Sequence, residues 1–143
     1  MHMQMNVQAK LDSALRFNID TGTGHSLILD TDEPDSGEES AGPCPMELLL
    51  SALAGCAGIE IMTILRKMKQ DIHDYAIEAH GEKVPQPPHI FHTITVEHHF
   101  TGSNIHADAI QRAISLVEKR YCSVGLMIDQ TTQITHTFSI QNM

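Results

Sequence analysis

The sequence predicts an α+β fold, and three observations support this prediction. Its 143 residues are 41% apolar and 19% charged, which is the balance of a single globular domain over residues 1–143. Short segments of alternating polarity, typical of strands, lie on both sides of one long apolar segment that is typical of a helix. The expected order is βββαββααβ, which groups strands and helices as α+β proteins do.

Residues 1–30 are expected to form a meander of strands. Val7, Ala9 and Leu11 alternate with polar neighbours, and residues 25–30 form a compact strand after a turn-forming segment. Residues 30–45 are polar and acidic and end in two prolines, so we expect a surface loop there.

A long helix is expected over residues 46–68. Almost every face of it is apolar, which is typical of a helix that is buried on most sides, and Glu47 in the first turn complements the helix dipole. Gly55 and Gly58 flank Cys56 in its middle, although glycine costs about 1 kcal/mol against alanine inside a helix. We therefore expect either the close approach of another helix here or access of a small reactant to the sulfur.

The second half of the chain predicts a hairpin, a second helix and a closing strand. The expected elements are two strands, a helix, a short apolar turn and a final strand, over residues 75–84, 92–100, 106–119, 124–128 and 134–140. Asn104 is the expected N-cap of the second helix.

The formal net charge of −9 argues against nucleic acid or an anionic membrane as a partner, since both bind clustered Lys and Arg. The N-terminus shows no signal peptide, and the longest apolar stretch, residues 48–59, is too short to span a bilayer. We therefore expect a cytoplasmic protein with no membrane partner, in a compartment that keeps thiols reduced.

Three cysteines in such a compartment are more often reactive or simply buried than a disulfide framework. Cys122 is expected at the N-terminus of a short helix beside Lys119 and Arg120, where the thiolate is favoured. Cys56 lies among small residues, and a sulfenic acid formed on one of these two cysteines could condense with the other. The spacing leaves open whether Cys56 and Cys122 meet or whether both are inert and buried.

Two neighbouring residues have simpler interpretations. Cys44 lies between prolines in the predicted loop, as an incidental exposed thiol would. Glu60 follows Cys56 by one helical turn, so its carboxylate either has a structural role or raises the pKa of a nearby thiol.

Two segments that contain cysteines resemble the motifs of one family. Residues 42–50, Gly-Pro-Cys-Pro-Met-Glu-Leu-Leu-Leu, lead into Ala-Gly-Cys at 54–56 and resemble the central-helix signature of the OsmC/Ohr family. Residues 119–124, Lys-Arg-Tyr-Cys-Ser-Val, resemble its second cysteine motif. Both helices and the closing strand also fall in the expected order, so the resemblance covers nearly the whole chain.

The resemblance implies an OsmC-like fold, in which a strand meander and a β-hairpin pack on a long central helix and a second helix. It implies an intertwined homodimer with two active sites at the subunit interface, and thiol-dependent reduction of hydroperoxides, preferably organic ones. Cys56 would be the peroxidatic cysteine and Cys122 the resolving one. A small or protein dithiol would regenerate the enzyme, with no metal and no other cofactor.

The sequence departs from the typical peroxidases of this family. Those proteins carry Glu immediately after the proline that opens the central helix. Here that position is Met46, and the acid is Glu47, one residue or about 100° of helix further on. They also hold the thiolate with an arginine from the N-terminal strands, and Arg16 is the only arginine before the central helix. Glu47 and Arg16 are therefore the candidate orienting groups, and the sequence resembles the less characterised YhfA-like branch more than the peroxidases.

Two hypotheses from other classes remain open. The first is a non-enzymatic dimer that binds a small apolar ligand at the subunit interface, which the displaced acid and the eight methionines favour. The second is a metal site on the ten histidines. His98 and His99 are adjacent on a strand and face opposite sides, and no Cys-x-x-Cys is present, so we expect scattered, solvated histidines and no metal.

Overall fold

The computed structural model describes residues 3–34 and 37–143, so Asp35 and Ser36 of the predicted acidic loop lie outside the described residues. The chain forms two compact units, residues 1–49 and residues 50–143. Its strands and helices follow one another in the predicted α+β order, which confirms the fold class.

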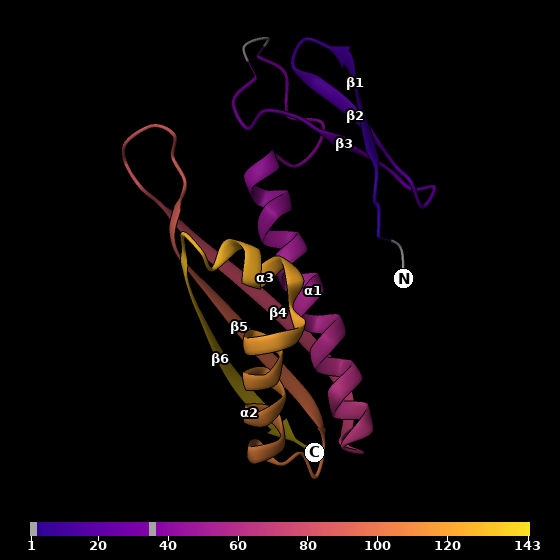
Figure 1. Ribbon diagram of the computed structural model, residues 1–143, viewed down its shortest axis with the longest axis vertical. Coiled ribbons are helices and arrows are strands. Elements are labelled where there is room, and N and C mark those ends of the chain that lie inside the picture. Colours follow the sequence, from indigo (N-terminus) through magenta and orange to yellow (C-terminus); the bar gives the residue numbers. More distant parts are fainter. Residues whose placement is uncertain (1–2, 35–36) are drawn as a thin grey trace. The chain divides into compact units, whose positions relative to one another are not determined.

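The first unit contains a three-stranded antiparallel sheet in the order β1-β2-β3, which confirms the predicted meander. The strands are Val7–Ser13, Arg16–Thr21 and Ser26–Leu29, drawn in indigo to purple in Figure 1. The loop after β3 returns to the end of that strand, because the backbone N–H of Asp30 donates to the carbonyl oxygen of Pro43 at 3.1 Å.

Helix α1, Pro45–Lys67, confirms the helix predicted over residues 46–68. Its first residue is a proline, which suits this position because the first N–H of a helix has no acceptor within the helix. The carboxylate of Glu47 accepts a hydrogen bond of 3.1 Å from the backbone N–H of Cys44. This contact is one half of a capping box, so Glu47 stabilises the start of the helix.

One stripe of α1 is buried, at the spacing of successive helical turns: Leu53, Ala57, Ile61 and Leu65. The expectation that the helix is buried on most sides is wrong for the chain taken alone, since Ile59 on another face is 70% exposed. By length and composition alone α1 could also cross a membrane, contrary to the sequence expectation, although the core helix of a soluble protein passes the same test.

The second unit is built on a sheet in the order β4-β5-β6, formed by Asp71–Lys83, Phe91–Ser103 and Gln133–Asn142. β4 and β5 form an antiparallel hairpin, and β5 and β6 run parallel. Every second residue from Ile94 to Gly102 is buried. One face of the sheet is therefore the packed face, and the face with Glu97 and His99 is the outer face.

The parallel strands β5 and β6 are joined by helical segments, as parallel pairs require. These are α2 (Ala107–Leu116), the π-helical turn η1 (Val117–Tyr121) and α3 (Ser123–Ile128), which lie over one face of the sheet in Figure 1. The N-cap of α2 is His106 and not the predicted Asn104, which turns the chain after β5 with a left-handed φ of 52°.

Candidate functional site

Cys56 and Cys122 meet inside the second unit. Cys56 lies in the middle of α1 and is part-exposed, whereas Cys122 is the N-cap of α3 and is 3% exposed. The two thiols are close enough for Cys56 to raise the pKa of Cys122. The Sγ of Cys56 also lies 3.8 Å from the Oγ of Ser123, the residue after Cys122. The fold therefore brings together two cysteines that the sequence alone could not place in contact.

The Cys122 thiol is held in its neutral form. Burial raises the pKa of Cys122 to about 11, and the neighbouring Cys56 thiol and the charge of Glu60 add to the rise. The backbone N–H of Gly125 donates to the sulfur at 3.3 Å and works in the opposite direction. The prediction that a helix N-terminus and the preceding basic residues favour the thiolate is thus wrong here. Burial outweighs a single N–H, and the basic side chains are exposed.

Small residues let the elements around the two sulfurs approach closely. A Cβ on Gly58 would lie 2.8 Å from Cδ1 of Ile77, so this glycine admits strand β4 and not another helix. A Cβ on Gly125 would lie 3.1 Å from the Sγ of Cys122. By contrast, apart from its chain neighbours and the backbone of its own helix, no atom of the described residues lies within 4 Å of the place where a Cβ of Gly55 would stand.

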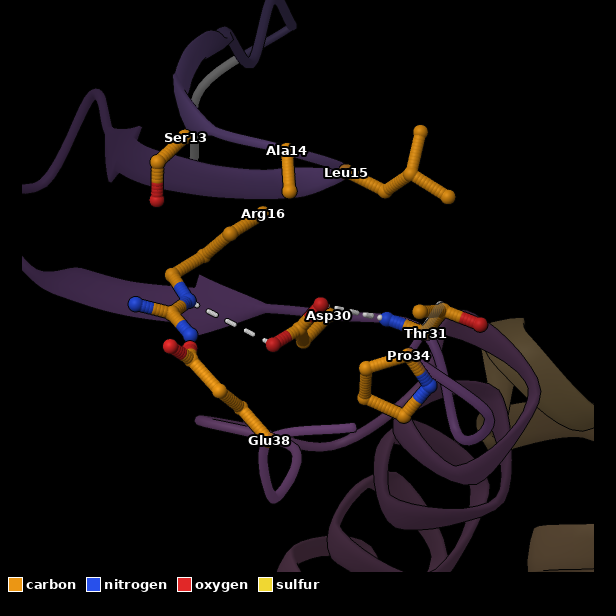
Figure 2. A pocket seen from close by; sticks show the side chains of 8 residues that line it. All are labelled: Ser13, Ala14, Leu15, Arg16, Asp30, Thr31, Pro34 and Glu38. Carbon is orange, nitrogen blue, oxygen red and sulfur yellow. Dashed lines mark hydrogen bonds and ion pairs between the residues drawn. The ribbon is translucent and has the colours of Figure 1, made fainter. Parts of the chain in front are cut away.

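Arg16 lies in the first unit, where its Nε donates to Oδ2 of Asp30 at 3.3 Å (Figure 2). The Asp30 carboxylate also accepts hydrogen bonds from the backbone N–H groups of Ala41 and Thr31, at 3.0 and 2.8 Å. These two backbone bonds, together with Arg16, hold the pKa of Asp30 below its usual range. Asp30 is thus a fixed anion that orients the arginine. Both line an open pocket of about 480 Å³.

Of the histidines that were expected to be solvated, His98 is buried and His136 is half-buried, which corrects that prediction. His98 is 0% exposed, and its Nδ1 lies 2.6 Å from the hydroxyl of Tyr75 while its Nε2 lies 2.9 Å from Nδ1 of His136. Burial lowers the pKa of His98 to about 4, helped by the charges of His136 and His99. Burial also lowers the pKa of His136, and the Glu118 carboxylate opposes that shift. The alternation of β5, which places His98 on the same side as Val96, was the signal that could have found it.

Another set of histidines lies on the outer face of the sheet, away from the cysteines. The imidazole of His80 lies 3.6 and 3.5 Å from the carboxylates of Glu78 and Glu97, and the imidazole of His99 lies 3.9 Å from both. Ligand atoms of Glu78, His80 and Glu97 come within 4.8 Å of one another. These exposed groups gather only through the pairing of β4 with β5, which sequence spacing did not reveal.

The chain matches the family model described as "OsmC-like protein" over residues 36–137. The chain belongs to the OsmC-like family. The resemblance predicted from the two cysteine motifs is thereby confirmed. Protein YhfA of Escherichia coli K12, a relative of this OsmC-like chain, is 32% identical over 136 residues, which cover 95% of this chain and 98% of YhfA.

Solved structures share the OsmC-like fold along nearly the whole chain. The crystal structure of a hypothetical protein from Aquifex aeolicus VF5 has a TM-score of 0.87 at 24% identity, with 99% of each chain covered. The organic hydroperoxide resistance protein OhrB of Bacillus subtilis has a TM-score of 0.66 at 15% identity, with 96% of this chain and 98% of OhrB covered. At these identities the likeness shows the fold alone.

Proposed function

We propose that this chain is a thiol-dependent hydroperoxide reductase in which Cys56 attacks the peroxide and Cys122 resolves the product. The observation that supports it is that a part-exposed cysteine, Cys56, lies beside a buried one, Cys122, with its Sγ 3.8 Å from the Oγ of the next residue, Ser123. A small peroxide can approach the part-exposed sulfur, whereas the buried sulfur is shielded from solvent. This difference in exposure supports the two different roles that a two-cysteine peroxidase needs.

The difference in burial between the two sulfurs supports this assignment of roles. Burial raises the pKa of Cys122 to about 11, so Cys122 keeps its proton at neutral pH. Cys56 is the part-exposed sulfur that a small reactant can approach, and the attacking form of a cysteine is its thiolate.

The proposed reaction has three steps. The Cys56 thiolate attacks one oxygen of the hydroperoxide, the O–O bond breaks, and the other oxygen leaves as an alcohol after taking a proton, which leaves Cys56 as a sulfenic acid. The Cys122 sulfur then attacks the Cys56 sulfur, an S–S bond forms, and the hydroxyl group leaves as water. A dithiol finally returns two electrons and two protons to the disulfide and restores both thiols.

We also propose that the working form is a homodimer in which a second copy covers the open face of α1. Ile59 is 70% exposed on a helix whose most apolar window is only 22% buried. A large apolar face of this kind is stabilised when a partner covers it. Arg16, held by Asp30, and Glu47 are the groups proposed to orient the reacting atoms, in line with the family resemblance.

Peroxide consumption by the purified chain tests the proposal. An organic hydroperoxide and hydrogen peroxide are offered in turn with excess dithiol to the wild type and to Cys56→Ser, Cys122→Ser and Cys44→Ser variants. We expect the wild type and the Cys44→Ser control to turn over. Cys56→Ser should fall to the dithiol blank. With stoichiometric peroxide and no dithiol, Cys122→Ser should react once per chain and stop at a sulfenic acid that dimedone traps.

A wild type that is no faster than the blank with any peroxide would overturn the proposal. Attention would then move to ligand binding by the dimer, which is the non-enzymatic alternative. Equal turnover by the Cys56→Ser variant would also overturn it, because the role of the part-exposed sulfur would be lost.

A further inference from the structure

A chain of three hydrogen-bonding side chains crosses the packed face of the β4-β5-β6 sheet. The Tyr75 hydroxyl on β4, the His98 ring on β5 and the His136 ring on β6 are linked by contacts of 2.6 and 2.9 Å. The rings are also stacked, with centroids 5.8 Å apart for Tyr75 and His98 and 5.2 Å apart for the two histidines. Their neighbours Ile94, Val96 and Phe100 on β5 are apolar and buried. Tyr75 and His136 are half-buried and His98 is fully buried. Packing alone does not require polar groups here, since such hydrogen-bonded groups are no more stable than apolar side chains of similar shape.

His136, the last of these three hydrogen-bonded side chains, lies beside the cysteine site. His136 lines a small cavity together with Cys122 and Glu118. Because Nδ1 of His136 is held by His98, Nε2 is the nitrogen that remains for a group in the cavity. The cavity has a volume of about 20 Å³, which is enough for one water molecule. One water could therefore bridge the imidazole and the Cys122 thiol.

The charges around His136 suit a group that takes up a proton. Glu118 on η1 and Asp129 at the end of α3 line the same cavity, and Ile134 and Gly125 complete its described lining without any Lys or Arg. On the sheet side, His98 is its hydrogen-bond partner. The Glu118 carboxylate favours the imidazolium form of His136, whereas burial favours the neutral form. A base needs this balance, because it must be neutral at rest and stabilised once it is protonated.

We propose that His136 is the general base of the resolving step and takes the proton of the Cys122 thiol through one water in the shared cavity. This inference rests on the proposed peroxide chemistry. His98 and Tyr75 are positioning residues that fix the ring, as the acid of a catalytic triad fixes its histidine.

The proton and electron balance of the step is complete. His136 accepts the Cys122 proton, the resulting thiolate attacks the Cys56 sulfur of the sulfenic acid, and the S–O bond breaks as the S–S bond forms. The departing hydroxide takes a proton, which the imidazolium can return through the same water. The net products are the disulfide and one water molecule, the peroxide having been the oxidant in the preceding step.

A base is needed at this site because Cys122 is almost entirely protonated at neutral pH. With a pKa of about 11, only about one Cys122 in ten thousand is a thiolate at pH 7. A positioned base contributes roughly 10²- to 10⁴-fold to such a proton transfer. Without it, the buried thiol would resolve the sulfenic acid slowly, and the oxidised Cys56 would remain open to further oxidation.

The test separates the two chemical steps in the wild type and in His136→Gln, a substitution that keeps an amide to bond His98 but has no base. Stoichiometric peroxide is added, Cys56 oxidation is followed by dimedone trapping, and disulfide formation is followed by loss of free thiol. At pH 7 we expect unchanged oxidation of Cys56 and disulfide formation about 10- to 100-fold slower. The deficit should shrink as the pH rises toward 10, because hydroxide replaces the missing base.

Two further variants keep the inference falsifiable. Tyr75→Phe removes the hydroxyl that bonds His98 and leaves the residues that line the cavity unchanged. It should slow disulfide formation less than His136→Gln does. His92→Gln, at an exposed position on the same strand as His98, is the matched control and should change nothing. A His136→Gln protein that forms the disulfide at the wild-type rate, or with a deficit that is equal at every pH, would overturn the inference.

Failure of the proposed function gives a different result. If the wild type does not reduce peroxides, diamide can oxidise Cys56 instead, and displacement by Cys122 then forms the same disulfide. A His136-dependent rate in that experiment would support the base while the peroxidase proposal fails. A His136-independent rate would overturn the base as well.

Discussion

The sulfur of Cys122 accepts a hydrogen bond of 3.3 Å from the backbone N–H of Gly125, so this cysteine caps helix α3 with its own reactive atom. A serine hydroxyl can accept the same bond, whereas alanine cannot. We therefore predict that Cys122→Ser is more stable than Cys122→Ala by about 1 kcal/mol, measured by urea unfolding of the reduced proteins.

The same pair of substitutions at Cys56 provides the control. Cys56 lies inside α1, where alanine is the better helix former. The order of stability should therefore reverse, with Cys56→Ala at least as stable as Cys56→Ser. If Cys122→Ala were the more stable of its pair, the sulfur would not act as a cap.

A second prediction concerns Glu60, whose charge raises the pKa of Cys122. In a background in which Cys44 and Cys56 are serines, Glu60→Gln should lower that pKa. The rate of alkylation of Cys122 by iodoacetamide at pH 8.5 should then rise by about two- to fivefold, because the thiolate fraction grows. Glu97→Gln on the outer face of the sheet is the control and should leave the rate unchanged. A fall in the rate after Glu60→Gln would contradict this electrostatic role.

The element order could be predicted because its signals are local. The alternation of β5, the proline that opens α1 and the motifs around Cys56 and Cys122 all lie within short stretches of sequence. The capping function of Glu47 was missed, because the residue that it caps is Cys44 and not the Ser or Thr that usually marks a capping box.

The features that could not be predicted depend on contacts between distant segments. His98 meets Tyr75 and His136 only through the register of three strands, two of which pair in parallel. The raised pKa of Cys122 likewise depends on burial beside α1, whose Leu53 lies 3.3 Å from the place of a Cβ on Gly125 and whose Glu60 adds to the rise. Local sequence predicted a helix N-terminus that lowers the pKa of Cys122 and favours its thiolate. Burial in the folded protein raises that pKa instead.

A third prediction tests the proposed dimer. The wild-type protein should elute with twice the chain mass of 15.8 kDa in light scattering coupled to gel filtration. Ile59→Glu should shift it toward the monomer mass, since a carboxylate cannot be buried unpaired in an apolar interface. Ile90→Glu, at a position that is 46% exposed in the connection between β4 and β5, is the matched control and should leave the mass unchanged. A monomeric wild type would reject the dimer.

The last prediction is a pH dependence of stability that comes from His98. Its pKa is lowered to about 4 in the folded chain, from a reference value of 6.5. Between these two values the unfolded chain binds more protons than the folded one, so the free energy of unfolding rises with pH across this range. The contribution of His98 to the free energy of unfolding is complete above about pH 6.5 and is lost as the pH falls through 4. For His98 alone it amounts to about 3 kcal/mol.

Urea unfolding at a series of pH values between 4 and 8 measures this effect. His98→Gln should lower stability at pH 7, because it disturbs the contacts with Tyr75 and His136, but it should also flatten the slope between pH 4 and 6.5. His92→Gln, at an exposed position on the same strand, should keep the wild-type slope. An unchanged slope in His98→Gln would mean that His98 is protonated without cost in the folded protein. Burial and the neighbouring His136 and His99 would then not hold it neutral.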